Sequence, residues 1–291
     1  EIVVLSGKGG TGKTSVAASL AVLAGAQAIV ADCDVDAANM HLLLQPQVQE
    51  TTEEYSGGLA EVDPQACDLS VSCAQVCRFG AIILSAARAA IDPLSCEGCG
   101  YCARVCPNHA IRMVPRKSGN LFVSMTRAGN TMVHARLDIG AENSGKLVAS
   151  VKNKATRLAQ ENGKEYVVVD GSPGIGCPVI SSLSGASFVL LVTEPTVSGL
   201  HDLQRLLALI GRFSIPSACI VNRCDLNPAQ HKKILEFLAS RDIPYLAGIP
   251  FDLRFTRAMI EGRTIVETDA PAGERLREVW RRLRDILANN P

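Results

Sequence analysis

A glycine-rich loop near the start of the chain carries residue types that bind phosphate. It reads Gly7-Lys8-Gly9-Gly10-Thr11-Gly12-Lys13-Thr14, which fits the pattern G-x-x-x-x-G-K-[ST], and Ser15 follows it. Glycines let successive backbone N–H groups turn toward a phosphate chain, a lysine adds positive charge at the β and γ phosphates, and a threonine hydroxyl ligates Mg²⁺. We therefore expect residues 7–15 to bind ATP, with Lys13 at the phosphates and Thr14 at Mg²⁺.

Cysteine is the second residue type that suggests chemistry. Seven of the eleven cysteines lie between Cys67 and Cys106, in a segment that repeats itself after 29 residues. The second half has the spacing C-x2-C-x2-C-x3-C-P of a bacterial ferredoxin, in which three thiolates hold one iron–sulfur cluster and the fourth reaches the other. A zinc site needs only two C-x-x-C pairs and would not explain the repeat.

Crossed ligation of this kind assigns two ligand sets. The first is complete, so we expect a 4Fe-4S cluster, and its four thiolates are those of Cys77, Cys96, Cys99 and Cys102. The second has three thiolates and, where the repeat requires a fourth, a serine: Cys67, Ser70, Cys73 and Cys106. Three possibilities stay open for the second set, namely a 3Fe-4S cluster, a 4Fe-4S cluster with Ser70 or water on the fourth iron, and a labile site. We slightly favour a 4Fe-4S cluster with a non-thiolate ligand.

Composition limits the partners and the compartment. The 291 residues include 29 Lys and Arg against 29 Asp and Glu, so net charge does not favour nucleic acid or an anionic membrane. No apolar run approaches the ~20 residues that span a bilayer. A disulfide framework does not fit a chain with nucleotide-binding features and no export signal. We expect a cytoplasmic protein that binds neither nucleic acid nor membrane.

Alternating strands and helices must position these residues. Residues 2–5 predict a strand, the glycine-rich loop follows, and the apolar periodicity of 16–24 predicts a helix. Later apolar runs, such as 166–170, predict further strands. We predict an α/β fold with a doubly wound, mostly parallel sheet, built from residues 1–59 and 114–291, and a bacterial-type ferredoxin domain of the α+β class inserted at 60–113.

Two segments of the second half have simpler expected tasks. Residues 118–145 are polar and glycine-rich, and we expect them to return the chain from the insert to the sheet. Residues 276–287 have apolar side chains at helical spacing among arginines. We expect this final helix to pack on the sheet rather than lie on a membrane, because its apolar stripe is narrow and acidic residues temper its basic face.

The loop resembles the deviant Walker A motif of the MinD/ParA family, because Lys8 stands at its second position. In that family this lysine reaches the nucleotide of the partner subunit, so the resemblance implies a homodimer closed over ATP. Residues 32–39 resemble switch I, which implies that Asp34 orients the attacking water and lies beside Mg²⁺. Asp36 is the competing candidate.

Later segments are similar to the rest of the family's nucleotide site. The run 166–170 resembles a Walker B strand, so Asp170 is the expected carboxylate on the Mg²⁺ side. Residues 171–176 resemble switch II, which senses the γ-phosphate. Two further loops, 222–225 and 249–252, resemble those that flank the base, and the residues implied there are Asn222, Asp225, Pro250 and Asp252.

The whole arrangement resembles MinD-superfamily ATPases with an inserted ferredoxin domain, which are related to the nitrogenase iron protein and to Mrp-type iron–sulfur carriers. The resemblance implies a dimeric, Mg²⁺-dependent ATP hydrolase that couples ATP to electron transfer to a partner metalloprotein. The alternative is a carrier or maturation factor that delivers an iron–sulfur or heterometal cluster. A positioning ATPase like ParA or MinD ranks third, because it must explain two redox centres.

Cys177 admits a further hypothesis. It follows Asp170 by seven residues, as a cluster-ligating cysteine does in the nitrogenase iron protein, but the companion position is Asn143. Two Cys177 thiolates, one from each subunit, would form an intersubunit metal site. The more ordinary hypothesis, which we favour, is a buried structural cysteine.

Overall fold

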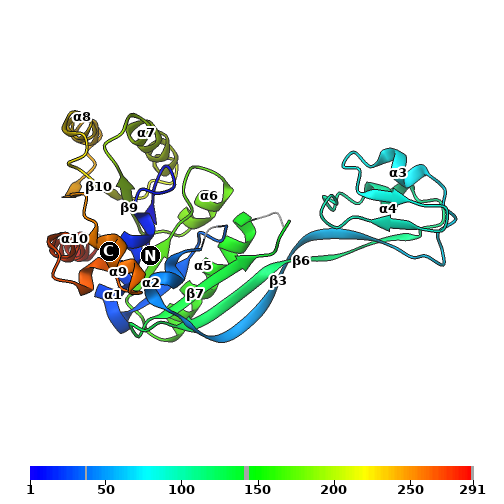
Figure 1. Ribbon diagram of the computed structural model, residues 1–291, viewed down its shortest axis with the longest axis horizontal. Coiled ribbons are helices and arrows are strands. Elements are labelled where there is room, and N and C mark those ends of the chain that lie inside the picture. The colour runs from blue at the N-terminus through cyan, green and yellow to red at the C-terminus, as the bar shows by residue number, and fades with distance from the viewer. Residues whose placement is uncertain (37, 141–143, 290–291) are drawn as a thin grey trace. The chain divides into compact units, whose positions relative to one another are not determined.

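Residues 1–36, 38–140 and 144–289 are described by the computed structural model (Figure 1). The chain forms two compact units. The first comprises Glu1–Thr52, Leu121–Arg136 and Ser144–Pro291, and the second comprises Glu53–Asn120 and Leu137–Asn143. The chain leaves the first unit within β3 (Gln47–Val62) and returns to it within β6 (Ile111–Met125). The predicted insert, 60–113, lies inside the second unit.

A nine-stranded sheet forms the centre of the first unit, in the order β11-β10-β9-β1-β8-β2-β7-β6-β3. The strands from β11 to β7 are parallel to their neighbours. Their bounds are Ile2–Leu5 (β1), Ala28–Asp32 (β2), Thr131–Leu137 (β7), Tyr166–Asp170 (β8), Phe188–Thr193 (β9), Ser217–Asn222 (β10) and Tyr245–Ile249 (β11). The predicted mostly parallel α/β sheet is therefore confirmed.

Helices cover both faces of this sheet (Figure 1). Ile2 and Val4 share a core with one group of elements: α1 (Lys13–Ala24), α2 (Met40–Leu44), the 3-10 turn η2 (Ile265–Glu267) and α10 (Pro271–Asn289). Val3 and Leu5 are also buried and, because side chains alternate along a strand, point to the opposite face. The helices that contact the sheet there are α5 (Ser144–Glu161), α6 (Cys177–Leu183) and α7 (Val197–Gly211).

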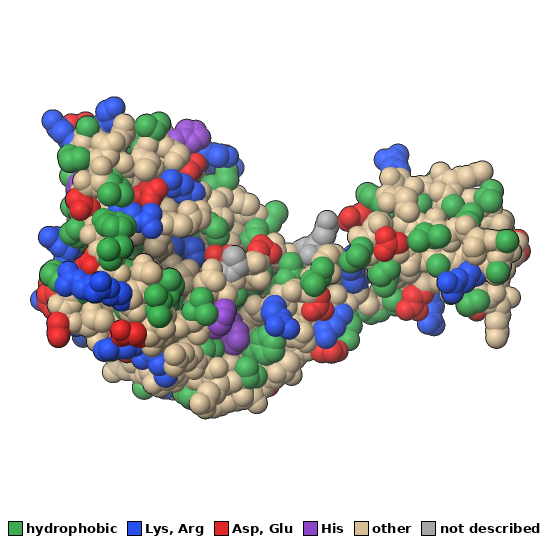
Figure 2. All heavy atoms as spheres, viewed as in Figure 1, with side chains coloured by type: hydrophobic (Ala, Val, Ile, Leu, Met, Phe, Trp, Pro, Cys, Tyr) green, Lys and Arg blue, Asp and Glu red, His purple; other side chains and the backbone are tan. Residues whose placement is uncertain are grey.

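The remaining elements of the first unit are short or peripheral. The 3-10 turn η1 (Gly25–Gln27) joins α1 to β2, α8 (Pro228–Ala239) packs on α7, and α9 (Arg254–Ile260) packs on η2. The prediction for α10 is confirmed, because Leu276, Val279, Trp280 and Leu283 are buried. No helix in the described ranges is long and apolar enough to cross a membrane. On the face drawn in Figure 2, basic side chains are interspersed with acidic ones.

Residues 118–145 return the chain to the sheet as expected, but they do so as strands, which the sequence did not indicate. Instead of a plain return connection, this segment contains the second half of β6 and all of β7, and β7 pairs in parallel with β2. Buried polar side chains hid the strand pattern, since Ser124 is fully buried and donates or accepts a hydrogen bond with His134 Nε2 at 2.9 Å. Asn143 lies outside the described residues.

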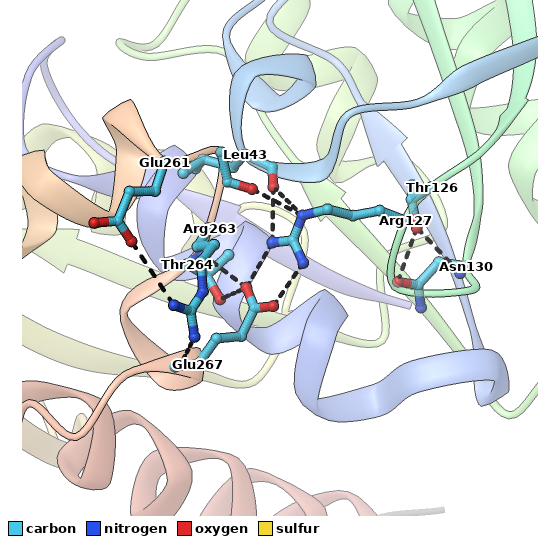
Figure 3. Close-up of polar contacts among 9 residues, drawn as sticks. Leu43, Thr126, Arg127, Asn130, Glu261, Arg263, Thr264 and Glu267 are labelled. Atoms are coloured by element: carbon cyan, nitrogen blue, oxygen red, sulfur yellow. Dashed lines mark hydrogen bonds and ion pairs between the residues drawn. The ribbon is translucent and has the colours of Figure 1, made fainter.

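The turn between β6 and β7 is fastened to η2 (Figure 3). The guanidinium of Arg127 donates to both carboxylate oxygens of Glu267 at 2.6 Å. It also donates to the carbonyl oxygens of Leu43 and Gly262 at 3.0 and 2.8 Å. Glu267 accepts a further hydrogen bond from the Thr264 backbone N–H at 2.8 Å. One side chain therefore connects three separate segments at this edge of the unit.

The second unit shows the internal repeat in its backbone. Helices α3 (Ser72–Val76) and α4 (Tyr101–Val105) occupy corresponding positions, and β4 (Ile82–Leu84) pairs antiparallel with β5 (Ala89–Ile91). Hydrogen bonds cross between the halves, because Asp63 N–H donates to Ala110 O at 2.7 Å and Asp92 N–H donates to Ala81 O at 2.8 Å. The two halves of the repeat thus pack on each other reciprocally.

Candidate nucleotide and cluster sites

Lys13 begins α1 and reaches two acids, Asp170 at the end of β8 and Asp34 two residues after the end of β2. Its Nζ lies 2.7 Å from Asp170 Oδ1 and 3.5 Å from Asp34 Oδ2. Burial is the largest influence and disfavours the charged amine, but the charge and hydrogen bond of Asp170, together with the charges of Asp34 and Asp32, outweigh it, so the pKa of Lys13 is raised. The structure therefore brings together three residues that the sequence analysis assigned to catalysis. Thr14 follows at the start of the same helix, half-buried, whereas Asp36 is exposed.

Asp32 is a site residue that the sequence analysis did not single out. It ends β2, is 1% exposed, and has a pKa of about 8, because burial and then the charge of Asp170 disfavour its ionised form. Its Oδ1 accepts a hydrogen bond from the Asp34 backbone N–H at 3.2 Å. Among the described residues, Asp32 Oδ2 and Asp170 Oδ2 are buried without a hydrogen-bond partner. Orphaned carboxylate oxygens beside a phosphate loop fit the ligand preference of Mg²⁺.

Close packing requires a glycine at two positions of the loop, Gly7 and Gly12. A Cβ on Gly7 would lie 2.4 Å from the Cβ of Asp202, and one on Gly12, which has a φ of 93°, would lie 2.4 Å from Asn222 Nδ2. The same amide nitrogen donates to the carbonyl oxygen of Thr11 at 2.7 Å. Asn222 therefore holds the phosphate loop against the end of β10.

A cavity beside the loop collects most of the residues expected at the base. Its lining includes Gly12 and Ser15 from the start of α1 together with Asn222, Arg223, Pro250, Phe251, Asp252, Phe255 and Thr256. Asp225 does not line it. Instead its Oδ1 accepts from the Phe251 backbone N–H at 2.7 Å and so ties the two loops together. Asp252 is held by Arg254 at 2.7 Å, whose hydrogen bond lowers the pKa of that carboxyl.

The two segments that resemble switch I and switch II contact one another and the end of β1. Ser172 Oγ donates to the Cys33 carbonyl at 2.7 Å, and Gly174 N–H donates at 2.9 Å to the carbonyl of Ser6, which directly precedes the phosphate loop. Lys8 Nζ lies 2.6 Å from Glu194 Oε1, a partner within the same chain that the sequence analysis did not foresee. The one feature of the sequence that pointed to Glu194 as a site residue is its position directly after a buried strand.

The four thiols of the complete set line one cavity in the second unit. Cys77, Cys96, Cys99 and Cys102 surround it together with apolar side chains such as Ile82. Cys96 is buried and Cys99 is exposed. The pKa of the Cys102 thiol is raised by burial and then by Cys96 and Cys99, because neighbouring thiolates repel one another. Thiols that converge on one space in this way fit a positively charged iron–sulfur core, which would offset the negative charges of all four thiolates.

The second set also comes together. Cys73 and Cys106 belong to one buried cluster, and Cys67 packs against it. Burial raises the pKa of the Cys73 thiol, and the charges of Cys106 and Cys67 raise it further. Cys106 Sγ accepts a hydrogen bond from the Ala110 backbone N–H at 3.3 Å, a contact of the kind that tunes cluster sulfurs. Ser70 donates its backbone N–H to Asp68 Oδ1 at 3.0 Å.

The loop around Ser70 keeps the conformation of the intact half. Leu69 has a φ of 59°, and the corresponding glycine, Gly98, has a φ of 65°. A left-handed leucine costs about 1–2 kcal/mol. Because the loop bears this cost, its shape follows the ligand-binding half of the repeat rather than the preference of its own residues.

Within the ranges that the structure describes, no three His, Cys, Asp or Glu side chains are grouped as ligands of a single metal ion. This is compatible with a cluster, because ligands of one ion converge on a point whereas cluster thiolates bind separate iron atoms. The fit of the two cysteine sets to an iron–sulfur group therefore rests on their thiol chemistry and spacing and, for the complete set, on the cavity that its thiols line.

Cys177 is exposed at the start of α6, so the favoured hypothesis of a buried structural cysteine is wrong. Cys33 and Cys219 are buried, as expected of core thiols, and burial raises the pKa of each. The hypothesis of an intersubunit metal site at Cys177 stays a prediction.

Comparison with known sequences gives matches over nearly the whole chain. The profile of the CobQ/CobB/MinD/ParA nucleotide binding domain matches residues 2–265. A protein of Methanocaldococcus jannaschii described as uncharacterised is 29% identical over 290 residues, which cover 99% of this chain and 97% of the relative. A second such protein of that organism is 24% identical over 268 residues, or 91% of each chain.

Solved structures share the fold. The septum site-determining protein MinD of Pyrococcus horikoshii, complexed with Mg-ADP, has a TM-score of 0.59 at 18% identity, covering 100% of this chain and 98% of that one. Aquifex aeolicus MinD in its complex with MinC has a TM-score of 0.59 at 18% identity, covering 98% of this chain and 95% of that one. The McdA(D38A)–ATP complex of Cyanothece has a TM-score of 0.58 at 16% identity, covering 99% of this chain and 95% of that one. At such identities these likenesses show the fold alone.

Proposed function

The chain belongs to the CobQ/CobB/MinD/ParA family of nucleotide-binding proteins, and on this premise we propose that it is a Mg²⁺-dependent ATPase that works as a homodimer and carries two iron–sulfur clusters. In this proposal, ATP binding and hydrolysis control electron transfer from the clusters to a partner metalloprotein. The family membership supports the nucleotide half. The iron–sulfur half rests on the cysteine unit, since the names of the relatives do not mention iron.

One observation carries the proposal. Four thiols spaced as in a bacterial ferredoxin line a single cavity in a compact unit, and the same chain has a complete phosphate loop. A cluster at this place would supply one-electron chemistry. The residues around it bury Cys96 and leave the Cys99 side open, which is the side from which a partner could exchange electrons.

In the nucleotide half, each residue would have a distinct task. Lys13 would leave its carboxylate partners to meet the β and γ phosphates, and Thr14, Asp34 and Asp170 would hold Mg²⁺ and its waters. The base would enter the cavity between Asn222 and Pro250. Asp34 would orient the attacking water, and its contact of 3.5 Å with the Nζ of Lys13, the residue that would meet the γ-phosphate, supports this role.

For the second cysteine set we propose a 4Fe-4S cluster with a non-thiolate ligand, from the Ser70 side chain or from water, on the fourth iron. The left-handed backbone that Leu69 shares with its counterpart Gly98 in the intact half, and the grouping of Cys67, Cys73 and Cys106, support it. A 3Fe-4S cluster is the alternative, and electron paramagnetic resonance of the oxidised protein separates them because only the three-iron form is paramagnetic there.

The test is an iron and sulfide count on anaerobically purified protein, with ATPase activity measured on the same samples. We expect about seven or eight irons per chain. Cys99→Ala should remove about half of the iron, and Cys224→Ala, outside both sets, should remove none. Lys13→Ala should abolish ATP hydrolysis and keep the iron. Two or fewer irons in the unaltered protein would reject the cluster half of the proposal.

The carrier hypothesis differs in what leaves the protein. A redox ATPase keeps its iron through many turnovers, whereas a carrier passes iron and sulfide to an acceptor. Protein loaded with ⁵⁷Fe and mixed with ATP and an apo-ferredoxin would show the difference. Label that stays on this chain after repeated turnover supports electron transfer, and label on the acceptor supports delivery.

The names of the relatives favour a third function. MinD is named as a septum site-determining protein, and its likeness to this chain strengthens the hypothesis of a positioning ATPase that the sequence analysis ranked lowest. Pelleting with anionic liposomes or with DNA tests it directly. Binding to either that appears with ATP and disappears with ADP would favour positioning, and it would require a new explanation of the cysteine unit.

A further inference from the structure

Glu194 joins two cations of the nucleotide site. It follows β9, is 8% exposed, and uses both of its carboxylate oxygens. Oε1 lies 2.6 Å from Lys8 Nζ, and Oε2 accepts from Arg223 Nη1 at 2.8 Å. Lys8 Nζ also donates to Ser198 Oγ at 3.0 Å. The loop lysine is thus held by groups of its own chain.

This position is hard to reconcile with a fixed role for Lys8 in the partner subunit. If the protein closes as a dimer over ATP, Lys8 must leave Glu194 to meet the other nucleotide. A carboxylate as buried as Glu194 would then lose a partner, and an unpaired buried charge is strongly destabilising. Arg223 prevents this, because its guanidinium stays on the other carboxylate oxygen.

Arg223 is also fixed for this task. Its backbone has a φ of 51°, a strained value for a residue with a side chain, and its N–H donates to Asn222 Oδ1 at 3.0 Å. It lines the cavity expected to hold the base. The acid that retains Lys8 is therefore paired with a residue that the nucleotide itself would contact.

We propose that Glu194 is a positioning residue that retains Lys8 within its own subunit, and that Arg223 sets how easily Lys8 is released by keeping Glu194 paired afterwards. The inference rests on the proposed dimeric ATPase. In this proposal, Glu194 and Arg223 together set the ATP concentration at which the dimer closes. Removing Glu194 and removing Arg223 should change that concentration in opposite directions.

The first test measures the reactivity of the Lys8 amine in nucleotide-free protein, by brief acetylation and mass spectrometry, with Lys154 as internal reference. Glu194→Gln should raise Lys8 labelling roughly fivefold, as loss of a partly exposed ion pair would. Arg223→Ala should lower it, because Lys8 becomes the sole counterion of Glu194. Glu274→Gln, which removes an exposed acid paired with Arg277 on α10, should change nothing.

The opposite signs keep the test sharp, because general loosening of the fold would raise labelling in both variants. Glu194→Asp, which retains the charge on a shorter side chain, should give a smaller increase than Glu194→Gln. Equal Lys8 labelling in the unaltered protein and in Glu194→Gln would overturn the inference, as would increased labelling in Arg223→Ala.

The second test measures the ATP concentration for half-maximal dimer formation by sedimentation velocity. Glu194→Gln should lower it and Arg223→Ala should raise it, with Glu274→Gln unchanged. If no dimer forms at any ATP concentration while the labelling changes occur as expected, the proposed dimeric ATPase fails and the retention of Lys8 by Glu194 stands. An unchanged threshold in both variants of a protein that does dimerise would overturn the inference.

Discussion

At the scale of single residues, Asp32 makes the nucleotide site sensitive to pH. Its pKa of about 8 lies above that of an ordinary carboxyl, so between pH 4 and 8 the folded protein holds a proton there that the unfolded chain releases. The stability that this proton contributes is therefore present below pH 4 and lost as pH rises through 8. Asn mimics the protonated side chain without titrating.

We therefore expect Asp32→Asn to become more stable relative to the unaltered protein as pH rises from 5 to 8. The relative gain should be at least about 1 kcal/mol, which corresponds to a shift of less than one pKa unit. Urea unfolding without nucleotide or Mg²⁺ measures it. Asp36→Asn, at an exposed position, serves as the control. A stability difference that is the same at both pH values would contradict the assignment.

Ser70 allows a second prediction at this scale. Ser70→Cys restores the fourth thiol in a loop whose backbone already has the shape of the intact half, as the φ values of Leu69 and Gly98 show. The variant should hold about eight irons per chain and keep them longer against a chelator. Ser72→Cys, two residues away, is the matched control. Equal iron content and equal chelation rates in all three proteins would show that position 70 does not face a cluster.

Residues within a local motif could be predicted from the sequence, whereas those defined by distant contacts could not. Lys13 and Asp170 were recognised because a loop pattern and the end of an apolar run mark them. Glu194 gave no such sign, since its partners Lys8 and Arg223 are far away in the sequence and meet it only because β1, β9 and β10 are adjacent strands.

At the scale of elements, the contact between the β6–β7 turn and η2 should matter for stability (Figure 3). Arg127→Ala leaves Glu267 without its bidentate partner and should lower the free energy of unfolding by about 1–3 kcal/mol. Arg157→Ala removes an exposed pair with Glu161 on α5 and should change it by less than about 0.5 kcal/mol. Chemical denaturation at pH 7 compares them, and similar losses in both would contradict the prediction.

The same contact predicts an acid dependence. Burial would raise the pKa of Glu267, but hydrogen bonds from Arg127 and Thr264 outweigh it and lower the pKa to about 2. A carboxyl with a lowered pKa stabilises the fold above its ordinary value and ceases to do so as pH falls from about 4.5 to 2. Part of the acid sensitivity of the protein should therefore disappear in Glu267→Gln.

Elements with a clear hydrophobic pattern could be predicted from the sequence, whereas strands β6 and β7 of the sheet could not. The buried run of β8 and the helical spacing of α10 both matched the structure. The sequence did not indicate β6 and β7, because β6 places polar side chains such as Ser118 and Ser124 in buried positions, where they are satisfied only by tertiary hydrogen bonds. Such a pattern is indistinguishable from a polar loop until the partners are known.

At the scale of the whole molecule, the question is whether the two units influence each other. The chain passes between them within β3, within β6 and near the end of β7. A change at the nucleotide would thus have a direct covalent route toward the cysteine unit. Arg112 and Glu61 link β6 and β3 at 2.9 Å in the second unit, and Lys117 and Glu53 link them at 2.8 Å.

If ATP controls the clusters, the clusters must also influence ATP, because a coupling free energy acts equally in both directions on binding. We expect the affinity for a non-hydrolysable ATP analogue to differ by about 5-fold or more between protein with oxidised clusters and protein with reduced clusters. Calorimetry under anaerobic conditions, at matched buffer and Mg²⁺, measures it. The variant Cys99→Ala, which lacks a ligand of the complete set, should lose most of the difference. Identical affinities in both redox states would mean that the two units share a chain without communicating, and the redox function proposed here would then be wrong even if both clusters are present.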